Sequence, residues 1–301
     1  MKYAQILLLN HCKILFKIEM KTVEQLQEIA AQVRRDIIRM VYNAKSGHPG
    51  GSLGCTDVVT ALFFEVMDIN PSNFTKEGRG EDMFFLSNGH ISPMLYSIMA
   101  RRGYFDIKEL ATFRKLGTRL QGHPTPVEKL PGLRIASGSL GQGLSVSIGA
   151  AIAKKHNQDP HVVYTLTGDG ELEEGQVWEA FMFAGAKKVD NLIAIIDHNK
   201  KQIDGSTDDV MPLGSLKDKL EAFQWIVLEM DGNDMKQVID TLHVAKSKLG
   251  QGRPVVVVMK TEMGMGVDFM MGTHKWHGTP PNQEQAERAL AQLPETSLGD
   301  F

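Results

Sequence analysis

Two oxygen-bearing side chains stand directly after apolar segments that have the composition of buried strands. Asp169 lies in a Gly-Asp-Gly turn behind residues 161–167, and Asn199 follows residues 191–197. Mg²⁺ accepts carboxylate and amide oxygens, and phosphate oxygens and water complete its shell. Flanking glycines let a ligand approach the backbone closely. A Gly-Asp-Gly sequence alone is equally well explained as a tight turn, but its pairing with Asn199 favours a site for Mg²⁺ and a diphosphate.

Histidines form a second group of candidate residues, because five of them lie in loops beside glycine or proline. The unperturbed pKa of histidine, about 6.5, suits proton transfer near neutrality. A single loop histidine is usually solvated or structural, whereas five in glycine-bracketed loops favour a polar pocket that binds oxygen-rich groups and moves protons. The five residues are His48, His90, His123, His274 and His277.

Three glutamates follow the Gly-Asp-Gly turn, namely Glu171, Glu173 and Glu174. They stand where a helix is expected to begin. Acidic side chains interact favourably with the dipole there, and this explains Glu171 and Glu173 without a functional role.

Several function classes are excluded by what the sequence lacks. There is no GxxxxGK[ST] motif, no dinucleotide fingerprint, no HExxH and no CxxC, which argues against a P-loop, NAD and zinc. The 33 basic and 36 acidic residues give a net charge of −3, so nucleic acid is not an expected partner. The two cysteines, Cys12 and Cys55, cannot form a disulfide framework and fit a reducing cytoplasm.

Apolar periodicity predicts the elements that position these residues. A capping box at Thr22 begins a helix that runs to Ala44 with one apolar stripe, and a Gly/Pro cluster at 46–54 ends it. Further helices are expected at 56–67, 92–102, 106–116, 140–157, 175–189 and 234–249, with loops at 68–81 and 117–138. Strands are expected at 83–86, 161–167, 191–197, 223–230 and 253–261.

Continuous apolar strands separated by helices are typical of an α/β fold with a mostly parallel sheet covered by helices on both faces. Ligands of such sheets bind beyond the carboxyl ends of the strands, where Asp169 and Asn199 are expected. Length alone suggests two domains, at about 150 residues each. The chain shows no linker or repeat, however, so residues 20–301 are predicted to be one domain.

Residues 1–19 are predicted to be an extension outside this domain. The apolar run at 6–18 is interrupted by polar residues, lacks a signal cleavage site and is too short to span a membrane. Met20 precedes the first helix and is an alternative start. No other segment is expected to cross a membrane.

The motifs together resemble the N-terminal, diphosphate-binding half of transketolase, a thiamine-diphosphate enzyme. The matching segments run in the family's order from about residue 25 to 280: SGHPGGSLG, FLSNGH, QGHP, GSLGQGLS, GDGELEEG, NLIAIIDHNK with QIDG, and HKWHG. Gly-Asp-Gly followed by asparagine is shared by thiamine-diphosphate enzymes of this superfamily. The histidine loops are a more specific signal, and they are similar to those of transketolase rather than to those of a pyruvate dehydrogenase component.

The resemblance implies a thiamine-diphosphate-binding fold and assigns the cofactor site. It implies that Mg²⁺ is held by Asp169, Asn199 and the backbone carbonyl of Lys201. The implied cofactor contacts are His90, Gly138, Ser139, Leu140, Gly168, Gly170, Glu174 and His277. Gly170 and His90 match diphosphate contacts, and Gly138 and Leu140 match the loop whose backbone meets the aminopyrimidine.

The resemblance also assigns catalytic roles. His48, His123 and His277 match histidines that bind sugar hydroxyls and shuttle protons, and Glu174 matches a glutamate in the proton network that links paired active sites. His274 matches a frequent neighbour without an assigned role. The sequence departs from the family at His198, Ser139 and Lys201. Only the carbonyl matters at position 201, so metal ligation is not affected.

By this resemblance the chain corresponds to the first domain of transketolases, and the second thiamine-binding domain and the third domain are expected on another chain. Those domains supply the glutamate that activates the aminopyrimidine, the aromatic residues that stack on it and the arginines that hold the sugar phosphate. The resemblance therefore implies the N-terminal subunit of a split transketolase, inactive without a C-terminal subunit that carries the pyrimidine-binding and C-terminal domains. A cytoplasmic α₂β₂ assembly of the pentose phosphate pathway, acting on sugar phosphates, is expected.

Two alternatives remain. The chain could serve a split ketol-transferase for an unusual sugar phosphate, or an enzyme similar to deoxyxylulose-phosphate synthase. A non-catalytic cofactor-binding subunit is the other alternative, and the retention of every oxygen ligand and pocket histidine argues against it.

Overall fold

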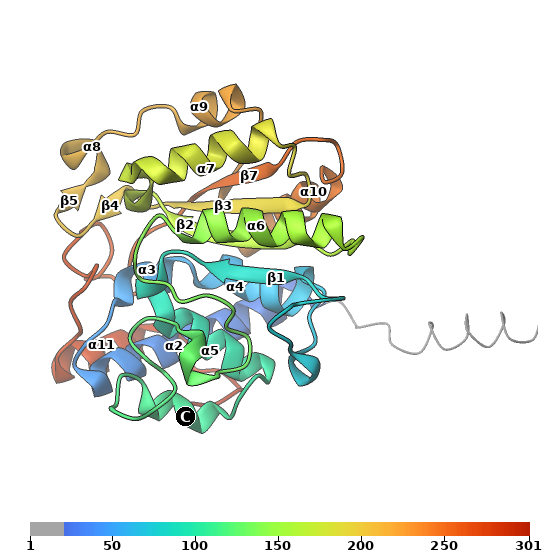
Figure 1. Ribbon diagram of the computed structural model, residues 1–301. Coiled ribbons are helices and arrows are strands. Elements are labelled where there is room, and N and C mark those ends of the chain that lie inside the picture. Colours follow the sequence, from blue (N-terminus) through green and yellow to red (C-terminus); the bar gives the residue numbers. More distant parts are fainter. Residues whose placement is uncertain (1–20) are drawn as a thin grey trace, which may run out of the picture.

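The computed structural model describes residues 21–301, so the predicted extension at 1–19 and Met20 lie outside the described residues. Its centre is a five-stranded sheet in which every neighbouring pair is parallel (Figure 1). The strand order is β1 (Met83–Leu86), β2 (Val163–Gly168), β3 (Leu192–His198), β7 (Val255–Lys260), β6 (Ile226–Asp231). The predicted α/β fold with a parallel sheet is confirmed.

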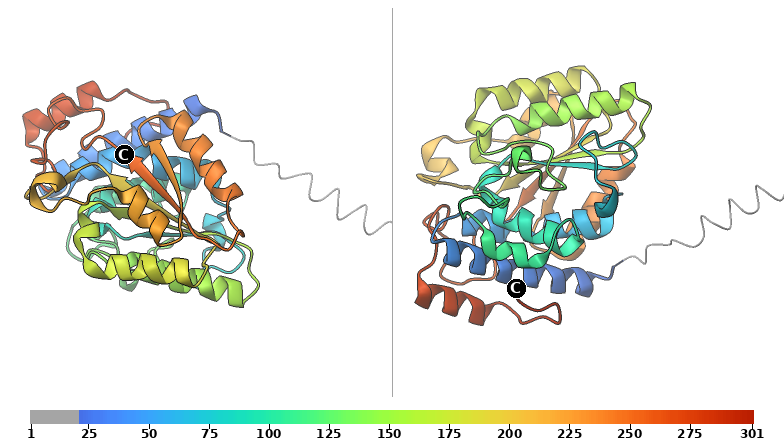
Figure 2. Two further views of the ribbon diagram at one scale, coloured as in Figure 1. Left: turned by 90° about the horizontal axis from the view of Figure 1, so that it is seen from above. Right: turned by 60° about the horizontal axis from the view of Figure 1, so that its bottom comes forward.

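Helices cover both faces of this sheet, as Figures 1 and 2 show. One face carries α6 (Gly143–His156), α7 (Gly175–Ala186) and α9 (Leu216–Ala222), and the other carries α2 (Val23–Ala44), α4 (Thr56–Ala61), α5 (Ser92–Arg102) and α10 (Met235–Ser247). Successive residues of β7 alternate between the two hydrophobic clusters, Val255 and Val257 on one side and Val256 and Val258 on the other. Because both faces are buried, the strands are continuously apolar.

The first long helix begins as its sequence predicts. The Thr22 hydroxyl accepts a hydrogen bond from the Gln25 backbone nitrogen at 3.3 Å, and the Gln25 side chain accepts one from the Thr22 nitrogen at 2.9 Å. Helix α2 is capped at its C-terminal end by Lys45, which adopts the left-handed conformation with φ 49°. The capping box and the apolar stripe are both confirmed.

The expected helix at 106–116 is confirmed only in part. The segment forms a shorter 3₁₀ helix, η4 (Ile107–Thr112), which Asp106 caps by accepting from the Lys108 nitrogen. The chain then reverses, since the Arg114 nitrogen donates to the Leu120 carbonyl at 2.8 Å. This reversal leads into the loop at 117–138.

Other elements are short and lie mainly between the predicted ones. They are α3 (Pro49–Gly54), η1 (Leu62–Val66), η2 (Pro71–Asn73), η3 (Gly89–Ile91), η5 (Pro126–Glu128), η6 (Gly170–Glu173), β4 (Lys201–Gln202), β5 (Gly205–Ser206), α8 (Thr207–Val210) and α11 (Gln283–Gln292). Strand β6 begins later than the predicted start at residue 223, because Phe223 and Gln224 close the turn after α9. Among residues 21–301, no helix has the length and apolar character that a membrane span requires.

Candidate active site

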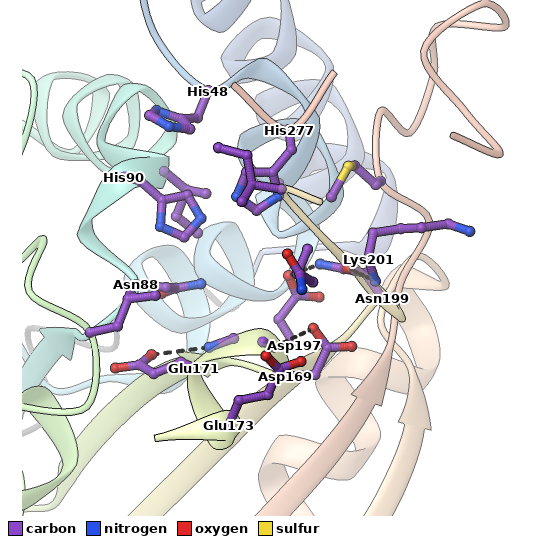
Figure 3. A pocket seen from close by; sticks show the side chains of 18 of the residues that line it. His48, Asn88, His90, Asp169, Glu171, Glu173, Asp197, Asn199, Lys201 and His277 are labelled. Atoms are coloured by element: carbon purple, nitrogen blue, oxygen red, sulfur yellow. Dashed lines mark hydrogen bonds between the residues drawn. The ribbon is translucent and has the colours of Figure 1, made fainter. Parts of the chain in front are cut away.

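A cavity of about 490 Å³ lies beyond the carboxyl ends of β1, β2 and β3, the edge where ligands of parallel sheets bind (Figure 3). Segments far apart in the sequence line it, from α3 to the loop before α11. The predicted site residues that it brings together are His48, His90, His123, Gly138, Leu140, Gly168, Asp169, Gly170, Asn199, Lys201 and His277.

Four histidine rings form one cluster in this cavity. The centroid of His48 lies 5.1 Å from that of His90, 6.3 Å from that of His123 and 5.9 Å from that of His277. The rings of His90 and His277 stack at 5.0 Å. Figure 3 shows His48, His90 and His277 together on the side of the pocket opposite Asp169.

Burial keeps these histidines uncharged at neutral pH. It lowers the pKa of His48 to about 4, with further contributions from His277, Arg114 and His123. Burial is also the main cause that lowers the pKa of His90, His123 and His277. Neutral imidazoles have one nitrogen that accepts and one that donates a proton, so the cluster can hold hydroxyl groups and exchange protons with them.

Asp169 is a buried carboxylate at the end of β2. Its oxygens accept from the backbone nitrogens of Gly170 at 2.9 Å and Lys200 at 2.6 Å. Burial, together with the nearby carboxylate of Asp197, raises the pKa of Asp169 to about 8. Ionisation of Asp169 is unfavourable without a compensating positive charge nearby. This is typical of a carboxylate that binds a cation.

Asn199 is held by its neighbours with its amide oriented. Its Nδ2 donates to Asp197 Oδ2 at 2.8 Å, and its Oδ1 accepts from the Lys201 nitrogen at 2.8 Å. These bonds identify the amide oxygen and bring the backbone at 201 next to it. Asp169, Asn199 and Lys201 thus meet in one cavity and offer a carboxylate, an amide oxygen and a carbonyl.

The loop before α6 approaches the histidine cluster closely at Gly138. The residue has φ 128°, a conformation that L-residues rarely adopt. A Cβ atom there would lie 2.8 Å from Cδ2 of His123. Glycine is therefore required at this position both by the backbone conformation and by the neighbouring ring.

Three of the sequence candidates lie outside the cavity. Ser139 and Glu174 are exposed and do not line it. His274 lines an adjoining hollow, which shares Ile203 and His277 with the main cavity.

Sequence reasoning did not single out Asp197 and assigned no site role to Glu171. Asp197 is 2% exposed and orients Asn199, and it is the final residue of an otherwise apolar stretch, which was the available signal. Glu171 is also 2% exposed and lines the cavity. Its helix-dipole explanation is wrong, since η6 has four residues and the side chain is occupied by specific hydrogen bonds.

Several buried polar atoms of this site have no hydrogen-bond partner within the described part of the chain. They include His48 Nδ1, Asn88 Oδ1 and His277 Nδ1. A buried polar atom without a partner is costly, so such groups normally meet a ligand or water. The residues present therefore fit a polar, anionic cofactor accompanied by a cation.

Comparison with known proteins identifies the class to which this fold and site belong. Residues 25–294 match the family model of the transketolase thiamine diphosphate binding domain. The chain belongs to this family.

The relatives include proteins of about the same length. An apulose-4-phosphate transketolase subunit of Phocaeicola vulgatus is 39% identical over 273 residues, which cover 91% of this chain and 95% of the relative. A 6-deoxy-6-sulfo-D-fructose transketolase subunit from a Clostridium species is 39% identical over 268 residues, covering 89% and 96%. Human transketolase is 33% identical over 288 residues, covering 92% of this chain but 43% of that protein.

Solved structures agree with the family assignment. Transketolase from Leishmania mexicana superposes with a TM-score of 0.83 at 31% identity, covering 92% of this chain and 42% of that one. Transketolase from Campylobacter jejuni gives 0.83 at 34% identity, covering 91% and 43%. The chain thus has the fold of the N-terminal transketolase domain and spans about two fifths of the length of these solved enzymes.

Proposed function

We propose that this chain is the N-terminal subunit of a two-subunit transketolase, which transfers a two-carbon ketol unit from a ketose phosphate to an aldose phosphate with thiamine diphosphate and Mg²⁺. The observation that carries the proposal is one cavity in which four neutral histidines face Asp169 and Asn199. The split is supported by relatives that are named as subunits and have nearly the same length. We take residues 20–301 as one cofactor-binding domain.

Asp169, Asn199 and the carbonyl of Lys201 would hold Mg²⁺. The raised pKa of Asp169 supports this role, because a cation beside the carboxylate would offset the cost of burying its charge. The set consists of oxygen donors, which Mg²⁺ prefers, and it leaves room for diphosphate oxygens and water.

Thiamine diphosphate, when bound, supplies the nucleophilic carbon and the electron sink that allow the C2–C3 bond of the ketose to break. The diphosphate end would lie against Gly168, Gly170, His90 and His277, at the turn after β2. The aminopyrimidine would lie against the loop of Gly138, Ser139 and Leu140. Asn88 adds a buried amide oxygen to the same wall.

The histidines would hold and deprotonate the sugar. Because burial keeps His48 and His277 neutral, each can accept a proton from a donor hydroxyl at neutral pH and return it later. His123, which also lines the cavity, would bind the hydroxyl at C1 of the sugar. The chain thus contributes hydroxyl recognition and proton transfer.

A partner subunit with the pyrimidine-binding and C-terminal domains would complete the site, and the active enzyme would be an α₂β₂ assembly. Whole transketolases are more than twice as long as this chain, which matches 43% of the human enzyme. Glu174, exposed at the start of α7, would join the proton network between two such sites.

The test is reconstitution. The chain is purified, combined with the candidate C-terminal subunit from the same cells, and assayed for two-carbon transfer between pentose phosphates with thiamine diphosphate and Mg²⁺. We expect activity only when both subunits and both cofactors are present, and none with Asp169→Asn. Activity of the chain alone, or an Asp169→Asn complex as active as wild type, would contradict the proposal.

A second candidate is ketol transfer on an unusual sugar phosphate. It is favoured by the name of one relative, which refers to apulose-4-phosphate, while the name of another refers to 6-deoxy-6-sulfo-D-fructose, a ketose that carries a sulfonate and no phosphate. The same complex should be assayed with these two ketoses and with xylulose 5-phosphate. The ketose with the highest kcat/KM identifies the donor class, and transfer from none of them argues for a non-catalytic subunit.

A further inference from the structure

Glu171 is a buried carboxylate that no step above uses. It lies in η6, one residue after the Gly-Asp-Gly turn, and it is 2% exposed. Its Oε1 accepts from the Ser87 hydroxyl and from the Gly141 nitrogen at 2.7 Å, and its Oε2 accepts from the Gly168 nitrogen at 3.2 Å. One side chain therefore joins three segments: the end of β1, the end of β2 and the loop before α6.

Ser87 extends this connection by one further bond. Its Oγ accepts from the Gly143 nitrogen at 3.0 Å, so its single hydrogen is left for Glu171. Glycine at 143 permits the close approach, since a Cβ atom there would lie 2.4 Å from the Ser87 side chain. Hydrogen bonds thus connect both ends of the segment 141–143 to Glu171, Gly141 directly and Gly143 through Ser87.

All the direct partners of Glu171 are donors, which explains why an acidic residue stands here. A carboxylate has two accepting oxygens and can satisfy Ser87, Gly141 and Gly168 together. A glutamine has one oxygen, so its NH₂ group would face a backbone N–H whichever way it turned. The arrangement requires the carboxylate and not only a side chain of that size.

We infer that Glu171 is a positioning residue, which fixes the loop 138–143 relative to the turn Gly168–Gly170. The inference rests on the proposed function, in which these two segments hold the aminopyrimidine and the diphosphate ends of one cofactor. The carboxylate sets the separation of the two segments before the cofactor arrives. Binding then needs no ordering of the loop, which lowers its cost.

Amide hydrogen exchange of the full-length chain without cofactor tests this inference. We expect Glu171→Gln to speed exchange at Gly141 and Gly143 by about ten- to a hundredfold, the effect of losing a hydrogen bond to a charged group. Exchange in β3 should remain unchanged. Ser87→Ala removes the hydrogen bond between this hydroxyl and Glu171 and the one from Gly143, so it should speed exchange most at Gly143. Glu179→Gln, the same substitution at an exposed position of α7, is the control.

Cofactor affinity provides the second readout. Thiamine diphosphate should bind Glu171→Gln about ten- to a hundredfold more weakly than wild type in calorimetry with Mg²⁺ and the partner subunit present. The inference is overturned if loop exchange matches that of Glu179→Gln, if exchange rises equally in β3, or if the loosened loop binds the cofactor as tightly as wild type. A wild-type complex that does not bind thiamine diphosphate at all refutes the proposed function instead, while the exchange result still decides whether Glu171 holds the loop.

Discussion

Alanine at Gly138 should damage the site through its backbone rather than through lost chemistry. Gly138 has φ 128°, and its missing Cβ is what lets the His123 ring lie against the loop. An L-residue held in this conformation costs about 1–3 kcal/mol. The contact at 2.8 Å between the new Cβ and the ring adds about 1–3 kcal/mol of overpacking.

The free energy of unfolding of Gly138→Ala should therefore fall by about 2–6 kcal/mol. Urea unfolding followed by tryptophan fluorescence measures this, and calorimetry with thiamine diphosphate and Mg²⁺ measures the accompanying loss of affinity. Gly149→Ala is the matched control, since Gly149 lies inside α6 with nothing within 4 Å of its Cβ position. That variant should be more stable by about 0.5–1 kcal/mol. Equal effects of the two substitutions would refute the reasoning.

Three further predictions concern protons. Apparent Mg²⁺ affinity, measured by calorimetry, should fall about tenfold per pH unit below pH 8. The reason is that Asp169, with a pKa of about 8, must lose its proton to bind the cation. An affinity that stays constant from pH 6 to 8 would show that Asp169 is not a ligand. The pKa of His48 in the folded chain, about 4, lies below the ordinary value of about 6.5. Between these two pH values the unfolded chain therefore binds more protons than the folded chain. The contribution of His48 to stability is thus lost as the pH falls from 6.5 to 4. Relative to His48→Gln, wild type should lose roughly 1–3 kcal/mol over this interval in urea unfolding, and parallel curves would contradict the assignment. His277→Ala should lower kcat of the reconstituted complex far more than its affinity for thiamine diphosphate, and equal losses in both would rule out a proton-transfer role.

The sequence predicted the structure correctly where a pattern of residues is compatible with only one kind of element. Continuous apolar stretches required strands buried on both faces, and the residues just behind them, Asp169 and Asn199, then had to lie at the ligand edge of the sheet. The predicted helix at 106–116 is present only as the shorter 3₁₀ helix η4, because the chain reverses at Arg114. That reversal is a tertiary effect which periodicity cannot show.

The partners of the candidate residues were harder to predict than the candidates themselves. Asp197 was counted as the end of a strand, and only the fold shows that it orients Asn199. Glu171 and Glu174 are three positions apart, and their local sequence does not show which of them is buried. One is buried against Ser87 and the other is exposed, because η6 turns the chain between them.

The residues that line the cavity lie far apart in the sequence, and this determines when the site can form during synthesis. His48 leaves the ribosome more than two hundred residues before His277, yet both line the same cavity. A nascent chain can build β1, β2 and their covering helices and still lack one wall of the pocket. The cofactor therefore cannot assist early folding steps, and it can stabilise only a chain that has already closed its final loop. Ligand added to a refolding mixture should accordingly raise the yield without accelerating the first phase.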